Sequence, residues 1–402
     1  MLKKFKFIVT NAFKGFIRGI ISLFPRDKSI CAFNCMTNSY KKIYGFTHNT
    51  KYLYLYMSNL TDSELMPIWI TPDKKIVRVL KKNGYKAYYK YSIKGIYYCL
   101  RAKYYLLNID IVNGEISNML SGGATTINLW HGVALKHIGK DNIGTFHKLP
   151  NWQKKIYTFL EPKNDYMIAS GEHEVRTYHT AFLMPENRVK ILGTPRLDTL
   201  FKEIKGENLF MEEDFQNILN IKSRGRKIII YIPTYRDTGI NIGNWIKSPE
   251  LSELLKIHNI TLLCKLHPAD SNSLSVQTTD EIYKIGNNSD VNAILKYTDA
   301  LITDYSSVAF DYLLLDKPII YFPLDLEEYQ ATCHGFYMPY DKFAVGEFAT
   351  TEQELLSKIQ DVVISGNDNF KEKRKMLRDE IYQYQDGNNC YRVLKWIKSL
   401  DK

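Results

Sequence analysis

The chain has 402 residues, which is more than one hydrophobic core usually supports. Of these residues, 45% are hydrophobic and 24% charged, and this composition excludes a disordered chain. The formal net charge is +11, but residues 1–28 hold seven basic side chains against one acidic side chain, which is more than half of the excess. Positive charge is therefore not spread along a groove, as in a nucleic-acid-binding protein, and we expect no nucleic-acid partner.

The six cysteines and nine histidines show no metal-binding spacing. No Cys-x-x-Cys pair and no His-Glu-x-x-His array occurs. The chain also has no Gly-x-Gly-x-x-Gly and no Walker-type Gly-Lys-Ser/Thr sequence, so dinucleotide redox and P-loop chemistry are poorly supported. We expect reduced thiols, no metal and no cofactor.

Residues 2–24 form a basic amphipathic pattern at the helical period. Its uncharged runs are too short to span a bilayer, and no small-residue cleavage site follows. We expect residues 1–28 to lie in the membrane interface on anionic lipid; the alternative is a helix packed on the protein's own core. The apolar face of this helix holds Phe5, Val9, Ala12, Phe13, Phe16, Ile20 and Leu23, and the basic face holds Lys3, Lys4, Lys14 and Arg18.

Strand-like apolar runs then alternate with helix-like segments in two halves, separated by a polar stretch at residues 202–226. This alternation predicts α/β architecture with parallel sheets, and we expect two doubly wound, Rossmann-like domains facing a cleft. The predicted ranges are 29–205 for the first domain, 206–370 for the second, and 371–402 for helices that pack back on the first. The runs lie at 29–36, 67–71, 104–109, 125–130, 165–170 and 188–192, and then at 227–234, 260–265, 281–285, 300–303 and 318–322.

Two histidines occur where strand-like runs end. His131 follows 125–130, with Gly132 next to it and Lys136 shortly after; His267 follows Lys265 at the end of 260–265. Ligands of open α/β sheets bind at the carboxyl ends of the strands, so these residues could line one crevice. A histidine there can take a proton, the glycine allows close approach, and the lysines can neutralise phosphate. The structural alternatives are a satisfied histidine and an ordinary strand exit.

A third motif follows another strand-like run. Thr303, Asp304, Tyr305, Ser306 and Ser307 open a helix-like segment. Backbone N–H groups and serine hydroxyls at a helix start can bind an anion, although serine also caps helices routinely. One serine could cap the helix while the other binds phosphate.

Two further loops carry arginines. Thr234 and Arg236 follow 227–234, and Arg196 lies in a Gly-Thr-Pro-Arg-Leu-Asp sequence that ends at Asp198. An arginine can make bidentate contacts to phosphate. Alone each signal is weak, and an Arg–Asp pair that closes a loop explains each of them equally well.

The ordered set of motifs resembles the CDP-glycerol glycerophosphotransferase family, the teichoic-acid primases and polymerases. Trp-His-Gly-x-x-x-Lys, Gly-x-Pro-Arg-x-Asp, Tyr-x-Pro-Thr-x-Arg, Lys-x-His-Pro, Thr-Asp-Tyr-Ser-Ser and the Asp325-x-x-x-Tyr329 pair span roughly residues 29–395. The resemblance implies a GT-B fold and a CDP-alditol donor that is bound mainly by the second domain. It also implies that His131 and His267 are essential and that Ser306 and Ser307 contact the donor's phosphates.

The chain departs from this family pattern at three places. Ala134 stands where the family often has proline, and Val345-Gly346-Glu347 replaces a Pro-Gly-Pro-like element. His334 stands where the family tends to have arginine, so it could replace that residue's phosphate contact.

The sequence therefore predicts a membrane-associated transferase at the cytoplasmic face of the cell membrane. By the resemblance, it moves an alditol phosphate, with glycerol phosphate expected, from a CDP-alditol to a hydroxyl of an acceptor and releases CMP. The acceptor would be a lipid-linked glycan or polyol phosphate of teichoic-acid or capsule type. The alternative is a GT-B glycosyltransferase that uses a nucleotide sugar.

Overall fold

The structure is a computed structural model of the chain, and it describes residues 2–38, 43–61, 64–109, 119–142, 148–160, 164–234, 243–266, 277–332 and 335–400. The chain divides into two compact units. Unit 1 comprises residues 1–131, 138–207 and 386–402, and unit 2 comprises residues 132–137 and 208–385. The chain thus enters unit 2 briefly, directly after His131, before it returns to unit 1.

Unit 1 is built on a seven-stranded sheet in which all neighbouring strands are parallel. Its central strands are buried along most of their length, which fits their continuous apolar sequences. A short antiparallel pair, β2 (Met36–Asn38) and β3 (Ile43–Tyr44), lies apart from this sheet. In sheet order the strands are β5 (Ala87–Tyr89), β4 (Met66–Thr71), β1 (Asp27–Phe33), β6 (Ala102–Leu107), β7 (Thr125–Asn128), β8 (Tyr166–Ala169) and β9 (Val189–Ile191).

Helices of unit 1 begin at residues suited to cap them. Asp73 accepts the N–H groups of Lys75 and Ile76, and Ser92 accepts that of Gly95. The α-helices are α1 (Leu2–Ile21), α2 (His48–Ser58), α3 (Lys74–Lys82), α4 (Ile93–Arg101), α6 (Asn151–Leu160), α7 (Glu172–Phe182) and α16 (Asn389–Ser399), and the 3-10 helices are η2 (Gly139–Asp141), η3 (Glu186–Arg188) and η4 (Pro195–Leu200).

Unit 2 repeats the design with six parallel strands. Its core joins apolar side chains of the sheet to those of the helices beside it. In sheet order the strands are β12 (Ile282–Lys284), β11 (Ile260–Cys264), β10 (Lys227–Ile232), β13 (Ala300–Thr303), β14 (Ile319–Tyr321) and β15 (Glu347–Phe348). The helices are α8 (Glu212–Ser223), η5 (Asn244–Lys247), α9 (Pro249–Ile257), α10 (Asn292–Leu295), α11 (Val308–Leu313), α12 (Leu326–Thr332), α13 (Tyr340–Phe343), α14 (Glu352–Ile359), η6 (Gln360–Ile364) and α15 (Lys371–Ile381).

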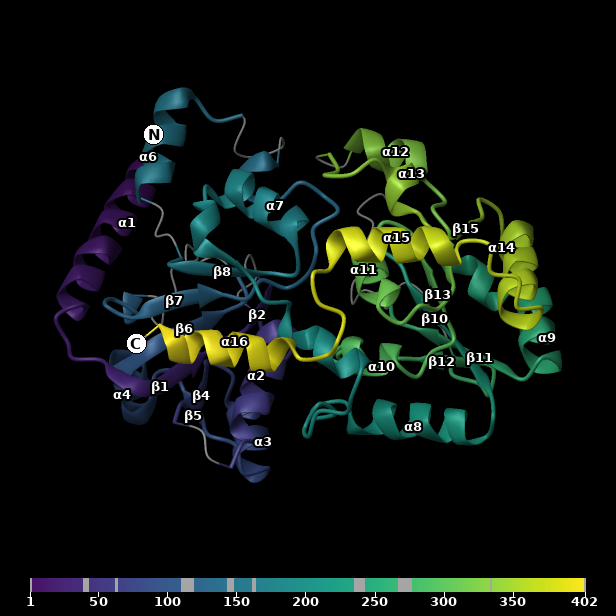
Figure 1. Cartoon of the computed structure of the whole chain (residues 1–402), viewed down its shortest axis with the longest axis horizontal. Coiled ribbons are helices and arrows are strands. Elements are labelled where there is room, and N and C mark those ends of the chain that lie inside the picture. Colours follow the sequence, from purple (N-terminus) through teal and green to yellow (C-terminus); the bar gives the residue numbers. More distant parts are fainter. Residues whose placement is uncertain are drawn as a thin grey trace. The chain divides into compact units, whose positions relative to one another are not determined.

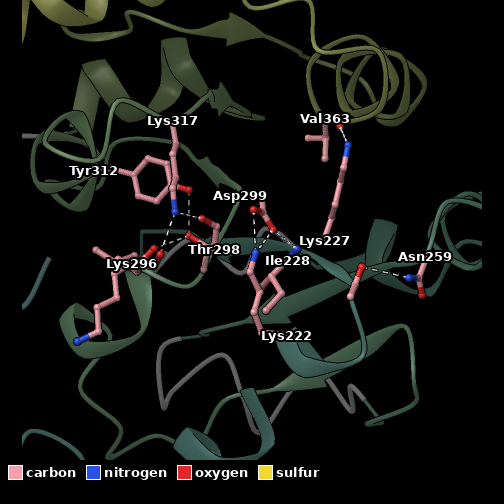
Figure 2. A network of polar contacts seen from close by, with 12 residues as sticks. Lys222, Lys227, Ile228, Asn259, Lys296, Thr298, Asp299, Tyr312, Lys317 and Val363 are labelled. Carbon is pink, nitrogen blue, oxygen red and sulfur yellow. Dashed lines mark hydrogen bonds and ion pairs between the residues drawn. The ribbon is translucent and has the colours of Figure 1, made fainter. Parts of the chain in front are cut away.

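Asp299 ties together the amino ends of the strands in unit 2 (Figure 2). Its carboxylate accepts the N–H of Ile228 at 2.7 Å and the ammonium of Lys222 at 3.0 Å. Nearby, the Lys317 ammonium donates to the backbone carbonyl oxygens of Lys296 and Thr298. This end of the sheet is thus occupied by contacts that hold the fold, while the predicted motifs follow the opposite, carboxyl ends.

The two C-terminal helices belong to different units. The sequence predicted that both pack on the first domain, but α15 packs on α11 within unit 2. Its Arg374 is buried and ion-paired with Asp368, which satisfies that charge inside unit 2. Only α16 lies in unit 1, where it packs on α2 and η4 (Figure 1).

Candidate active site

The chain before His131 holds an unusual conformation. Trp130 has a φ of +51°, a value that a bulky residue adopts only where its surroundings compensate the cost. The side chain of Asn128 accepts the Trp130 N–H at 2.8 Å. The buried Asn49 of α2 donates its side-chain amide to the carbonyl oxygens of Leu129 at 2.8 Å and Trp130 at 3.0 Å. These bonds fix the direction in which His131 leaves β7.

The ring of His131 is oriented by the neighbouring strand. Its Nδ1 lies 3.1 Å from the carbonyl oxygen of Asn108, directly after β6. A carbonyl oxygen only accepts, so Nδ1 carries the hydrogen and Nε2 keeps its lone pair. The residue has an exposed edge, yet the protein atoms crowded around the ring lower its pKa, and the positive charge of Arg196 acts in the same direction. His131 is therefore a neutral imidazole at neutral pH and can accept a proton at Nε2.

Arg196 lies near His131 but is only 2% exposed. Its backbone N–H donates to the side-chain oxygen of Asn49 at 3.0 Å, which joins the start of η4 to the start of α2. The sequence left open an Arg–Asp pair for this motif. Asp198 accepts the N–H groups of Asn389 at 2.8 Å and Cys390 at 2.9 Å, at the start of α16. Within this motif, Asp198 thus anchors the C-terminal helix, and Arg196 acts electrostatically on the histidine.

In unit 2, the Thr-Asp-Tyr-Ser-Ser motif follows β13 as predicted. Thr303 is buried and donates its hydroxyl to the carbonyl oxygen of Ile232 at 2.7 Å. The Asp304 carboxylate accepts the N–H of Thr234 at 2.9 Å. These side chains hold the loop that follows β10, and their predicted contact with substrate stays a prediction.

The two serines of the motif are placed differently from Thr303 and Asp304. Ser307 is exposed and Ser306 is half-buried, directly before the six-residue helix α11. Neither side chain caps α11: Ser307 occupies the N-cap position without a side-chain hydrogen bond to the helix. These hydroxyls are therefore the part of the motif that a ligand can reach.

An aromatic stack lies beside this motif. The rings of Tyr305 and Tyr329 are 4.1 Å apart and nearly parallel, and the Tyr305 hydroxyl donates to Asp325 at 3.1 Å. The Lys136 ammonium lies 5.0 Å from the centroid of the Tyr329 ring, within the range of a cation–π contact. Unit 2 thus brings Lys136 and the Asp325–Tyr329 pair together with the loop that carries the serines.

Lys136 reaches this place because the segment after His131 belongs to unit 2. The backbone of Lys136 forms an isolated antiparallel β-bridge with that of Phe336, and the Tyr337 N–H donates to the carbonyl oxygen of Leu135 at 2.8 Å. Gly132, which the sequence assigned to close ligand approach, is buried at the start of the segment. The segment that follows the candidate base of unit 1 therefore makes its contacts within unit 2, with Tyr329, Phe336 and Tyr337.

Lys265 points toward the protein's own backbone. Its ammonium donates to the carbonyl oxygens of Gly286 at 2.6 Å and Asn287 at 3.0 Å. Burial lowers the pKa of Lys265 to about 8, against the opposite effect of Asp290 and Asp214. The structure gives this side chain a role in holding the 286–287 turn, and its predicted substrate contact is untested.

Three of the predicted site residues, His267, Arg236 and His334, lie outside the described residues. Within the described ranges, no three His, Cys, Asp or Glu side chains gather closely enough to hold a metal ion. The sequence missed Asn49 and Asn108, which orient His131, because neither belongs to a strand-end motif with titratable groups. It also missed His48, whose ring lies 5.8 Å from that of His131.

Two Rossmann-like sheets define a GT-B-like fold, which confirms the predicted fold class. The wall teichoic acid polymerase TagF shares it, with a TM-score of 0.74 over 99% of this chain and 98% of that chain, at 20% identity. A UDP-bound structure of MnaA from S. aureus is a more distant match, with a TM-score of 0.52 at 13% identity over 92% of this chain and 96% of that chain.

Residues 34–399 match the family described as CDP-Glycerol:Poly(glycerophosphate) glycerophosphotransferase, and the chain belongs to this family. It is 31% identical to the teichoic acid ribitol-phosphate polymerase TarK of Staphylococcus aureus, over 67% of this chain and 51% of that protein. It is 25% identical to a teichoic acid poly(glycerol phosphate) polymerase of Bacillus spizizenii, over 89% of this chain and 90% of that protein. The chain thus spans about half the length of the ribitol-phosphate polymerase and nearly all of the glycerol phosphate polymerase.

Proposed function

We propose that this chain transfers an alditol phosphate, glycerol phosphate first among the candidates, from a CDP-alditol to a hydroxyl of a lipid-linked teichoic-acid or capsule-type acceptor. The observation that carries the proposal is the geometry of His131 in a member of this family. Its Nδ1 is committed to a backbone carbonyl oxygen, and its lowered pKa keeps Nε2 unprotonated. A general base of this kind is what the activation of a hydroxyl requires.

In the proposed reaction, the acceptor oxygen attacks the phosphorus atom that carries the alditol. A new P–O bond forms to the acceptor, and the bond from that phosphorus to the bridging oxygen of CMP breaks. The hydroxyl proton moves to Nε2 of His131, and CMP leaves as the second product. His131 thus raises the nucleophilicity of the acceptor at the moment of attack.

Unit 2 is proposed to bind the donor. Ser306 and Ser307 offer hydroxyls that reach solvent. The Lys136 ammonium contacts the ring of Tyr329, which stacks on Tyr305, the residue directly before Ser306. These donors and this cation suit the negative charge of a pyrophosphate, which grows on the leaving CMP. His267, Arg236 and His334 are proposed to join them because they stand at the family's motif positions.

The amino-terminal helix supports the proposal of a membrane-associated enzyme. On α1 and the turn after it, Phe13 is 61% exposed, Phe16 66% and Leu23 83%. Arg18, predicted on the solvated face, is half-buried, and burial lowers its pKa against the opposing effect of Asp165. The helix therefore turns apolar side chains outward, which is the reverse of a helix packed on its own core. Such a face suits the lipid interface, with the basic residues drawn to anionic headgroups.

The end of this helix is held firmly on unit 1. The Arg26 guanidinium donates to the carbonyl oxygens of Cys99 at 2.7 Å and Leu120 at 2.8 Å, and also to those of Ala102 and Gly122. Among the residues that the structure describes, no helix combines the length and the apolarity needed to cross a bilayer. We propose that the chain is a peripheral protein on the cytoplasmic face of the cell membrane, where a lipid-linked acceptor would be presented to unit 1.

Release of CMP tests the proposed donor. Purified protein is given a lipid-linked acceptor together with CDP-glycerol, CDP-ribitol or a nucleotide sugar, and nucleotide products are separated by chromatography. Acceptor-dependent release of CMP from one CDP-alditol is expected, and the preferred donor identifies the alditol. Consumption of the nucleotide sugar, with both CDP-alditols untouched, would instead support the glycosyltransferase alternative.

A further inference from the structure

A second histidine lies beside His131 in unit 1. His48 is the first residue of α2, and its ring centroid lies 5.8 Å from that of His131, with the ring planes at 51°. Both side chains keep some exposure to solvent. The Trp130 ring also contacts His131, with a centroid distance of 4.2 Å. His131 therefore has one aromatic neighbour without a titratable group and one, His48, that can carry a positive charge.

The position of His48 is fixed by its surroundings. Its φ is +60°, a conformation that costs free energy for a residue other than glycine. The next residue is the buried Asn49, whose side chain is bonded to the carbonyl oxygens of Leu129 and Trp130 and to the N–H of Arg196. The start of α2 is therefore locked to the two residues that precede His131, so the two histidines keep their spacing.

Among the described residues, Arg196 of η4 acts on His131 as a positive charge, and His48 of α2 faces it with its ring. Arg196 also acts electrostatically on the Tyr178 hydroxyl of α7, which donates to Glu174 at 2.7 Å, and that carboxylate also accepts the N–H of Ser170. The Glu174 carboxylate thus accepts bonds from two partners of its own, while the ring of His48 contacts that of His131.

We propose that His48 is a positioning residue for the proposed phosphotransfer, forming with His131 a coupled pair in which a proton on either ring disfavours a proton on the other. The proposal rests on the proposed function of His131 as the base. Two imidazolium rings at this separation repel each other, so their protons leave in two steps that belong to the pair. While His48 is protonated, His131 remains neutral and able to accept the hydroxyl proton. After transfer, the same repulsion favours release of that proton from His131 to water.

The coupling is measured by an NMR pH titration of protein carrying ¹³C-labelled histidine, with the His131 signal assigned through His131→Asn. The variants are His48→Asn, which removes the charge and suits a positive φ, and His48→Asp, which reverses the charge. The expected midpoint of His131 rises by about half a pH unit to one pH unit in His48→Asn, and further in His48→Asp. His258→Asn, a surface histidine substitution in unit 2, is the matched control and should leave the His131 midpoint unchanged.

The acid limb of kcat/KM should move with the NMR midpoint in the same order of variants. A purely structural role for His48 would lower stability or yield without moving either midpoint, and that result would overturn the proposal. An unchanged His131 midpoint in both folded variants would overturn it as well. The NMR titration needs no turnover, so it decides whether the two histidines are coupled even if the protein shows no phosphotransferase activity. A missing activity would count against the proposed function alone.

Discussion

Asn49 and Arg196 are 147 residues apart in the chain, yet the side-chain oxygen of Asn49 accepts the backbone N–H of Arg196 at 3.0 Å. The amide nitrogen of the same side chain holds the carbonyl oxygens of Leu129 and Trp130. One buried side chain thus joins the start of α2, the start of η4 and the segment that leads to His131. The orientation of the candidate base depends on this residue as much as on its own strand.

Replacement of Asn49 tests this role. Asn49→Ala removes three buried hydrogen bonds and leaves their backbone partners unsatisfied, so we expect a loss of about 2–4 kcal/mol in the free energy of unfolding. Chemical denaturation measures it. Asn59→Ala at the other end of α2 removes an exposed hydrogen bond to the carbonyl oxygen of Lys205 and a side-chain bond with Tyr85, and it serves as the matched control. Equal losses in the two variants would contradict the role of Asn49.

The pH dependence of activity follows from the lowered pKa of His131. The base must be neutral to accept a proton, so activity is present above its pKa and is lost as the pH falls through it. Because burial and Arg196 lower that pKa, the acid limb of kcat/KM should be centred below pH 6.5, the ordinary value for histidine. A limb centred above pH 6.5 would show that another group, or a differently placed histidine, controls the reaction.

Gly193 should tolerate no side chain. It has a φ of +76°, and a Cβ there would lie 2.0 Å from the side-chain oxygen of Asn389 at the start of α16. Gly193→Ala should therefore cost about 2–4 kcal/mol, through backbone strain and the displacement of α16. Gly225→Ala is the matched control, because Gly225 has a φ of +71° but nothing within 4 Å of the added atom. Thermal unfolding of both variants separates the cost of the steric contact with α16 from the cost of backbone strain, which both variants share. Equal losses of stability in the two variants would count against close packing of α16 on this loop.

Membrane binding should depend on the exposed face of α1. The double substitution Phe13→Ser and Phe16→Ser removes two exposed aromatic side chains from the proposed interface, so sedimentation with phosphatidylglycerol vesicles should fall by roughly tenfold or more. Ile257→Ser with Met376→Ser removes comparably exposed apolar side chains from unit 2 and is the matched control. Turnover of a water-soluble acceptor analogue should be unchanged. Vesicle binding that both pairs reduce equally would contradict a specific role for α1.

The strands were predictable because parallel strands buried on both faces appear as continuous apolar runs. The run at 227–234 became β10, and the run at 300–303 became β13. The short strand β5 was not among the predicted runs, since its three residues do not form a clear apolar run. The division of the C-terminal helices was also missed, because their helical patterns do not reveal which core each helix joins.

At the site, strand-end position alone identified His131, but the residues that orient it could not be found in this way. Asn49 and Asn108 act through bonds to distant backbone atoms, and a sequence pattern carries no record of such partners. Lys265 shows the opposite limit. Its place in a motif suggested a ligand contact, whereas its ammonium is directed at two backbone carbonyl oxygens.

The most direct test of the central claim is acceptor-dependent CMP release by wild-type protein and by His131→Ala, with the preferred CDP-alditol at saturating concentration. His258→Ala serves as the histidine control, and circular dichroism establishes that each variant is folded. Loss of a general base predicts that His131→Ala is roughly 100- to 10,000-fold slower than wild type, with His258→Ala unaffected. Turnover by folded His131→Ala within a few-fold of wild type would contradict the assignment of His131 as the base.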